Sequence, residues 1–209
     1  MENTYPLNKT ALILVDVLND FLADDGKLNE KVQPMIEKMG LKANLKNLIE
    51  SSRKAGIKIV YAPHGLDEHS FENLPHVLPR MQWAKDNHIF WKDSKGADFY
   101  QEFYPVEGDI VAERHHIFDS FYNTDLDQQL RANGIENVVL AGFTSQTCVE
   151  GTGRHALEAG YHVTFLTDGV AEFTQRAHDM AIEISYPAFG HAVLTIAEFL
   201  EALNASAIV

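Results

Sequence analysis

The chain has 209 residues, of which 45% are hydrophobic and 22% charged, a composition typical of one soluble globular domain over residues 1–209. Its formal charge is −13, with 30 acidic against 17 basic residues, and this excess of acid argues against nucleic acids and anionic membranes as partners. One cysteine excludes an internal disulfide, and the first ten residues lack the basic and apolar regions of a signal peptide. No apolar run approaches the ~18 residues of a membrane span, so we expect a cytoplasmic protein.

The first predicted element is a strand at 11–17, ALILVDV, whose nearly continuous apolar run is typical of a central strand buried on both faces. A helix is expected over 31–56, with Gly56 as its C-cap, and a second strand over 57–63. The segment from His64 to Pro105 breaks this rhythm, because it is long, weakly periodic and rich in His, Pro and aromatic residues. Such segments are usually functional or mediate contacts. We expect this segment to line an active site or to form a subunit interface.

The second half of the chain continues the alternation of strands and helices. The expected elements are a strand at 108–113, a helix at 124–134, a strand at 135–142, a helix at 147–160, a strand at 161–169, a helix at 174–190 capped by Thr174, and a short strand followed by a helix that begins near Thr195. This alternation predicts an α/β fold with a parallel sheet that helices cover on both faces.

The single thiol, Cys148, lies just past the fourth predicted strand and near the start of a helix. Ligands of open parallel sheets bind beyond the carboxyl ends of the strands. A helix N-terminus offers free N–H groups and a positive dipole end, which lower the pKa of a thiol and can bind an oxyanion. The position suits a nucleophile, which would react fast with iodoacetamide at neutral pH, but an inert buried thiol is an equal alternative.

Two further groups are expected at the same edge of the sheet. Asp16 ends the first strand, where it either caps the following turn or acts as a general base for the thiol. His115 and His116 follow the third strand, where a cation would stabilise a thiolate. Three chemically matched groups at three strand ends favour a catalytic site over an inert thiol.

Three stretches, ALILVDVLNDF, GDIVAERHHIFDSFYNTDLDQQLRANGIENVVLAG and FTSQTCVEGTGRHALEAGYHVTFLTDGVA, resemble the isochorismatase-like cysteine hydrolase superfamily in order and spacing. The resemblance implies a three-layer α/β/α fold of Rossmann-type topology, a homo-oligomer, no cofactor, and an Asp–Lys–Cys triad that hydrolyses C–N bonds of small amides or ureides through a thioester. Carried over to this chain, it makes Asp16 the general acid and base and Cys148 the nucleophile. It also implies a non-proline cis peptide at Phe143–Thr144, which would direct the N–H of Thr144 at the oxyanion beside that of Cys148.

The chain departs from this pattern at the lysine. Six residues before Phe121, where the family has its lysine, the chain has His115, and no lysine follows Lys95. Either His115 takes the place of the lysine or the third role is filled differently. An imidazole has an unperturbed pKa near ~6.5, and a neighbouring carboxylate and thiolate favour its charged form. Activity should then fall at high pH, and a flat rate from about pH 6 to 9 would contradict this role.

The substrate pocket is expected to be lined mainly by aromatic side chains, although each of these is equally suited to core packing. The residues predicted to line it are Phe21, His116, Phe118, Phe121 and Tyr122, with Trp83 or Trp91 from the long segment and the polar Ser145 and Gln146 beside the nucleophile. No metal site is expected: His64, Asp67 and His69 lack the spacing of the Asp-x-His arrangement of nicotinamidases and favour a solvated loop.

Alternative functions are each opposed by one feature. Vinyl-ether hydrolysis of isochorismate on the same scaffold does not need the cysteine, so Cys148 weighs against it. A redox or thiol-bearing binding protein would use a resolving cysteine, and the chain has a single cysteine. A nucleotide-binding domain would show a glycine-rich phosphate loop after a strand, and none is present. The sequence favours a small-molecule amidohydrolase without specifying its substrate.

Overall fold

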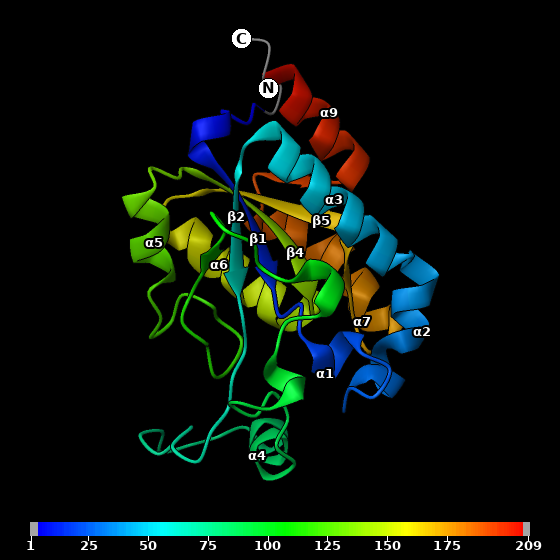
Figure 1. The fold of residues 1–209 in the computed structure, drawn as a ribbon, viewed down its shortest axis with the longest axis vertical. Coiled ribbons are helices and arrows are strands. Elements are labelled where there is room, and N and C mark those ends of the chain that lie inside the picture. Colours follow the sequence, from blue (N-terminus) through cyan, green and yellow to red (C-terminus); the bar gives the residue numbers. More distant parts are fainter. Residues whose placement is uncertain (1–3, 207–209) are drawn as a thin grey trace.

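The computed structural model describes residues 4–206, which are arranged around a six-stranded sheet (Figure 1). All neighbouring strands are parallel, in the order β3-β2-β1-β4-β5-β6. The strands are β1 (Thr10–Val15), β2 (Lys58–Ala62), β3 (Ile110–Val111), β4 (Asn137–Phe143), β5 (His162–Ala171) and β6 (Ala192–Leu194). The parallel α/β fold that the alternating pattern predicted is therefore confirmed.

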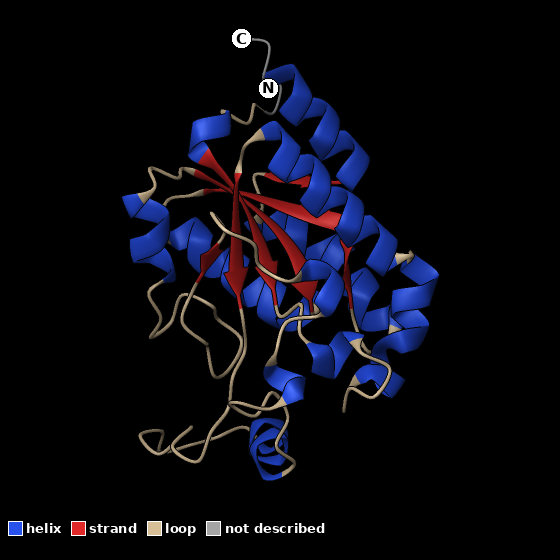
Figure 2. Cartoon of the chain, viewed as in Figure 1, coloured by secondary structure: helices blue, strands red, loops and turns tan. Residues whose placement is uncertain are grey.

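Helices cover both faces of the sheet and make three layers (Figure 2). The helices are α1 (Asn19–Leu22), α2 (Asn29–Met39), α3 (Leu41–Ala55), α4 (Pro79–Asp86), α5 (Leu126–Ala132), α6 (Glu150–Glu158), α7 (Gln175–Met180), α8 (Tyr186–Phe189) and α9 (Ile196–Ser206). Helices α2, α3 and α9 pack on one face, and α5 and α6 lie on the other. Shorter 3₁₀ segments are Leu7–Lys9, Lys95–Ala97 and Gln101–Phe103, and π-helical segments are Ser145–Val149 and Ala181–Ser185.

The central strand β1 supplies both hydrophobic cores. Leu12 and Leu14 point into the cluster formed with α2, α3 and α9, whereas Ile13 and Val15 point into the cluster formed with α5 and α6. Successive side chains of a strand alternate between faces, so a strand covered on both sides must be apolar throughout. The uninterrupted apolar run at the start of the chain is explained by this position.

Strands β1 and β4 approach each other closely where they end. Val15 of β1 pairs with Gly142 of β4, and a Cβ atom on Gly142 would lie 2.0 Å from the carbonyl oxygen of Val15. Gly142 also has a φ of 117°, a conformation that side-chain-bearing residues rarely adopt. Glycine is therefore required at this position, and it brings the residues that follow β1 and β4 together.

Two predicted helices are interrupted in the structure. The helix expected over 31–56 divides at Gly40, which has a φ of 60° and donates its N–H to Ile36 and Glu37 as the C-cap of α2. The helix expected over 174–190 contains a π-helical turn between α7 and α8. Thr174 caps α7 as predicted, since its side chain accepts from the N–H of Ala177.

The long segment from His64 to Pro105 divides into a part near the sheet and a part that projects from it. Helix α4 lies at the projecting end, below the sheet in Figure 1. Nearer the sheet, the buried carboxylate of Asp20 accepts from the N–H of Phe90 at 2.6 Å and that of Lys27 at 3.2 Å. This carboxylate fastens the segment to the turn that follows β1.

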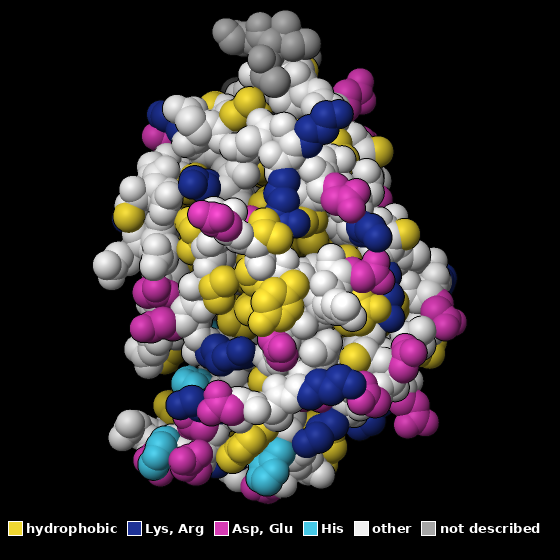
Figure 3. Space-filling model, viewed as in Figure 1, with side chains coloured by type: hydrophobic (Ala, Val, Ile, Leu, Met, Phe, Trp, Pro, Cys, Tyr) yellow, Lys and Arg dark blue, Asp and Glu magenta, His cyan; other side chains and the backbone are white. Residues whose placement is uncertain are grey.

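The charges of the surface are mixed. On the face drawn in Figure 3, basic side chains are interspersed with acidic ones and form no continuous basic stripe. Within residues 4–206, no helix has the length and apolar character needed to cross a membrane.

Candidate active site

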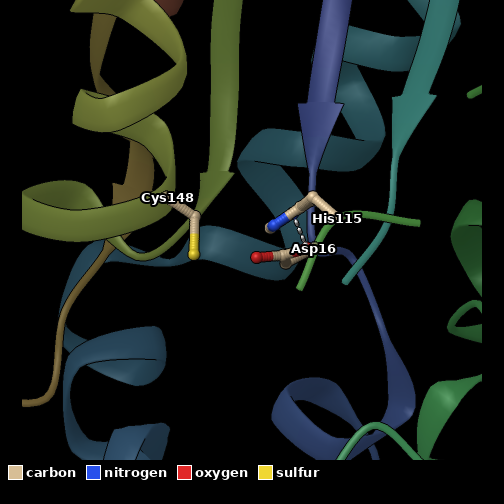
Figure 4. Close-up of side chains that lie close together, drawn as sticks. All are labelled: Asp16, His115 and Cys148. Atoms are coloured by element: carbon tan, nitrogen blue, oxygen red, sulfur yellow. Dashed lines mark hydrogen bonds and ion pairs between the residues drawn. The ribbon is translucent and has the colours of Figure 1, made fainter. Parts of the chain in front are cut away.

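The carboxyl edge of the sheet brings together Asp16, His115 and Cys148. Asp16 follows β1, Cys148 lies in the π-helical segment after β4, and His115 lies in the chain that follows β3 (Figure 4). One potential ligand atom from each of the three side chains lies within 4.8 Å of the others, and all three are buried. The proximity that the sequence predicted for these groups is present in the structure.

Asp16 is held in an unusual backbone conformation and is fully buried. Its φ is 54°, which for a residue with a side chain costs about 1–3 kcal/mol and is found mainly at functional sites. Its Oδ1 accepts from the backbone N–H of His64 at 2.6 Å and lies 3.0 Å from Nε2 of His115. Its Oδ2 has no hydrogen-bond partner in the described chain, and Figure 4 shows a carboxylate oxygen directed at the sulfur of Cys148.

The carboxylate of Asp16 is stabilised in its ionised form. Burial alone would raise the pKa of Asp16, but the charge of His115 and its hydrogen bond outweigh burial and leave the pKa below its usual value. Asp16 is therefore an acceptor of protons throughout the neutral range.

A second imidazole, that of His64, packs against the ring of His115. The two ring centroids are 4.9 Å apart, and Nδ1 of each ring is buried without a hydrogen-bond partner in the described chain. Burial, with the neighbouring His115 adding to it, lowers the pKa of His64 to about 3, so this ring is neutral. The prediction of a solvated loop is wrong at His64, whose side chain is buried, whereas the side chain of His69 is 72% exposed.

Cys148 lies in the first turn of a π-helix, and its thiol is not a thiolate at rest. Burial and the negative charge of Asp16 raise its pKa well above the usual value, against smaller opposing effects of Thr147 and the backbone of Thr144. The expectation that a helix N-terminus would lower this pKa is therefore wrong, because desolvation beside a carboxylate outweighs the dipole. Fast alkylation at neutral pH is no longer expected.

The backbone around the sulfur has two unusual features. The peptide between Phe143 and Thr144 is cis, as the family resemblance implied. The N–H of Val149 donates to the carbonyl of Thr144, five residues back, in a π-helical turn that includes Cys148. The N–H groups of Thr144 and Cys148 are therefore candidates for the oxyanion site.

Three of the predicted pocket residues line one cavity beside the triad. His116, Phe118 and Tyr122 border a cavity of about 570 Å³, which Ile117 also lines. The thiol of Cys148 donates to the carbonyl of Ile117 at 3.8 Å. Ile117 thus both lines this cavity and contacts the sulfur, so the cavity is a candidate entrance for a substrate.

The other predicted pocket residues have different surroundings. Phe21 packs near the site, stacked on Phe143 at 4.7 Å between centroids. Phe121 instead stacks on His155 at 4.8 Å and is buried in the core under α6. The remaining predicted residues lie as follows: Ser145 is buried and bonded to His178, Gln146 is exposed with its backbone N–H bonded to Glu172, Trp83 is exposed on α4, and Trp91 packs on His88.

Besides His64, two aromatic residues that lie against Phe21 were not predicted from the sequence as part of the site. Phe90 packs against both Phe21 and His64, with centroids 5.0 Å away in each case. Phe173 lies 6.1 Å from Phe21 and is 39% exposed. The position of Phe173 just past the fifth strand is a signal that could identify it, whereas Phe90 lies in the irregular segment and carries no such signal.

Comparison with known proteins agrees with this geometry. A family model described as the Isochorismatase domain matches residues 10–198. Ureidoacrylate amidohydrolase RutB of Pantoea ananatis is 30% identical, over 84% of this chain and 76% of its own length. The crystal structure of N-carbamoylsarcosine amidase from Thermoplasma acidophilum has a TM-score of 0.67 and 27% identity, covering 90% of this chain and 95% of its own. A cysteine hydrolase from Pseudomonas syringae pv. phaseolicola shares the fold, with a TM-score of 0.79 at 21% identity, over 97% of this chain and 96% of its own. The chain belongs to the isochorismatase family.

Proposed function

We propose that this protein is a cysteine hydrolase that cleaves a C–N bond of a small, non-peptide amide or ureide. The observation that carries this proposal is the convergence of a carboxylate, an imidazole and a thiol within 4.8 Å at the carboxyl edge of the sheet. The amidohydrolase and amidase among its relatives support the same bond type. A homo-oligomer remains part of this proposal, as does the cytoplasmic location.

In the proposed first step, Asp16 takes the proton of Cys148 while the sulfur attacks the carbonyl carbon. The pKa of the thiol is raised and that of the carboxyl is lowered, so transfer of this proton is unfavourable before substrate binds. It becomes favourable as the S–C bond forms and the negative charge passes to the carbonyl oxygen, where the N–H groups of Thr144 and Cys148 can stabilise it. The thiol is thus activated only by a substrate in position.

The remaining steps return the enzyme to its resting state. Asp16 gives its proton to the departing nitrogen as the C–N bond breaks, which leaves a thioester on Cys148. Asp16 then takes a proton from the water that attacks the thioester, and it returns this proton to the sulfur of Cys148 as the C–S bond breaks and the acid is released. His115 is bonded to Oδ1 and leaves Oδ2, which has no hydrogen-bond partner in the described chain, available to exchange the proton with the sulfur.

The test is a screen of small amides and ureides for ammonia release, run in parallel on wild type and Cys148→Ala. Primary amides release ammonia directly, and terminal ureides release it when the carbamate decomposes. For any substrate found, intact-protein mass spectrometry after rapid acid quenching should show an acyl adduct on wild type and none on the variant. Turnover that survives in Cys148→Ala would refute the proposal.

A further inference from the structure

The cluster at the carboxyl edge of the sheet contains an imidazole, His115, at the position where the family resemblance implies a lysine. A lysine beside a thiol and a carboxylate is a cation that repels metal ions, whereas an imidazole nitrogen is a metal ligand. Thiolate, imidazole and carboxylate together form a ligand set that zinc and related soft divalent cations prefer. The chain therefore holds, within its candidate active site, donors that the family's triad lacks.

The geometry of these donors suits a tetrahedral ion. One donor atom from each of Asp16, His115 and Cys148 lies within 4.8 Å of the others. Zinc–ligand bonds of roughly 2.0–2.3 Å place the ligand atoms of a tetrahedral site about 3.3–3.7 Å apart. Binding of the ion therefore requires side-chain rotations that bring the three buried donors from within 4.8 Å to this separation.

A second observation indicates that the site has an unused ligand. Oδ2 of Asp16 is completely buried, has no hydrogen-bond partner among residues 4–206, and belongs to a carboxylate directed at the sulfur. Buried carboxylate oxygens are normally paired, and an unpaired one often marks an ion or another group that binds there. The bond that Oδ1 accepts from the N–H of His64 does not involve a proposed ligand atom and holds this carboxylate in place.

We propose that Asp16, His115 and Cys148 form an inhibitory binding site for a soft divalent cation of the zinc class. The ion binds Oδ2, Nε2 and Sγ. The thiol proton and the Nε2 proton of a charged His115 leave to solvent, the hydrogen bond between Nε2 and Oδ1 is given up, and the remaining imidazole proton resides on Nδ1. Because the ion occupies the sulfur that would attack the substrate, cation and substrate exclude each other. The inhibitory effect rests on the proposed hydrolase function, whereas binding itself rests only on the geometry.

Cobalt(II) reports this binding without any substrate. Addition of one equivalent of Co²⁺ to the reduced protein should produce an intense near-ultraviolet sulfur-to-cobalt charge-transfer band, and Zn²⁺ should then abolish it by displacement. His69→Ala is the matched control, since it removes an exposed histidine that lies beside Glu68 and Glu72 and could bind the ion on the surface. The control should leave the band unchanged.

Variants of the triad separate this proposal from its alternatives. Cys148→Ser should lose the band, and His115→Lys should weaken Co²⁺ binding by more than the roughly 10–100-fold that loss of an outer-shell partner costs. His115→Gln provides a second test if a buried lysine prevents folding, and circular dichroism checks the fold of each variant.

The outcomes of these tests are decisive in both directions. Absence of the band in folded wild type, or its persistence at full strength in a folded His115 variant, would overturn the metal site. A protein that binds Co²⁺ through Cys148 but hydrolyses no amide would retain the metal site and refute the proposed function. A protein that hydrolyses amides but gives no cobalt band would do the reverse.

Discussion

Two buried polar clusters lie on either side of the π-helical turn after β4, and they are built in opposite ways. The reactive cluster comprises Asp16, His64, His115 and Cys148, and the anchoring cluster comprises Ser145, Glu172, His178 and Tyr186. In the anchoring cluster, Oγ of Ser145 bonds Nδ1 of His178 at 3.0 Å, and Tyr186 donates to the carbonyl of Ser145 at 3.0 Å. The carboxylate of Glu172 accepts from the N–H of Gln146 and that of its own neighbour, Phe173.

In the reactive cluster, several buried polar atoms have no hydrogen-bond partner in the described chain, whereas the polar side chains of the anchoring cluster are hydrogen-bonded. Oδ2 of Asp16 and Nδ1 of both histidines are buried without partners in the described chain. Each unsatisfied buried group costs about 1–3 kcal/mol, so such groups persist where a later partner, such as a substrate, completes them. This difference indicates that the anchoring cluster holds the π-helical turn in place, whereas the reactive cluster is available for chemistry.

The largest effect should come from Cys148→Ser. A hydroxyl gives up its proton less readily than a thiol, and Asp16, with its lowered pKa, is a weak base, so kcat should fall by about 10⁴-fold or more. The change is small and conservative, so the thermal midpoint should move little. A variant that retains wild-type kcat would remove Cys148 from the reactive cluster.

Asp16→Asn should lower kcat by about 10²–10⁴-fold, because the amide keeps the shape of the carboxylate but cannot take the thiol proton. The measurement is steady-state hydrolysis of the substrate found by the amide screen. Partial recovery of activity at high pH, where solvent hydroxide can deprotonate the thiol, would sharpen the assignment.

The substitution Asp16→Asn also tests how the charge of this carboxylate contributes to the stability of the fold. The pKa of Asp16 in the folded protein is lowered below the unfolded value of about 3.9. Its carboxylate therefore stabilises the fold fully above that pH, and this stabilisation is lost as the pH falls through the lower, folded pKa. Urea unfolding between about pH 2 and 5 should show a steeper loss of stability in wild type than in Asp16→Asn. Equal slopes would contradict the lowered pKa.

His115→Gln should have a smaller effect that depends on pH. Without the histidine, the charge and hydrogen bond that keep the pKa of Asp16 low are weakened, and burial then raises it. The acid limb of the pH–rate profile should therefore move to higher pH than in wild type. A limb that stays in place would show that His115 does not tune this carboxylate.

Ser145→Ala should have the smallest effect on activity and a clear effect on stability. It leaves Nδ1 of the buried His178 without its partner, which should cost about 1–3 kcal/mol in the free energy of unfolding. We expect kcat to change by less than about tenfold. A large loss of kcat with unchanged stability would assign Ser145 to the reactive cluster after all.

The fold and the triad were predictable because each depends on a regular pattern. The apolar run at 11–17 indicates a doubly covered strand, and chemical groups that follow parallel strands meet at one edge. Asp16, His115 and Cys148 could be brought together on this basis alone. The break at Gly40 was not predictable in the same way, because apolar residues at helical spacing continue through it and do not reveal a φ of 60°.

The environment of each side chain was less predictable than the position of its residue relative to the sheet. The spacing of Phe121 and Ser145 places them near the site, but it does not determine which way the side chains point, and both point into packed interiors. The pKa of Cys148 depends on burial and on the charge of Asp16, which act through space and not along the chain. The irregular sequence around His64 predicts a solvated loop, although the N–H of this residue binds the carboxylate at the centre of the site.

Gly142 links the sheet to the chemistry without touching any substrate. Because no side chain separates it from Val15, the final residues of β1 and β4 lie close enough for the segments after the two strands to meet. A methyl group there would force the ends of β1 and β4 apart and would move Asp16 away from the sulfur of Cys148, although both side chains would still be present. In a saturation mutagenesis screen for activity, position 142 should tolerate as few replacements as positions 16 and 148. A natural variant at Gly142 should therefore lose activity as a variant of the catalytic residues does.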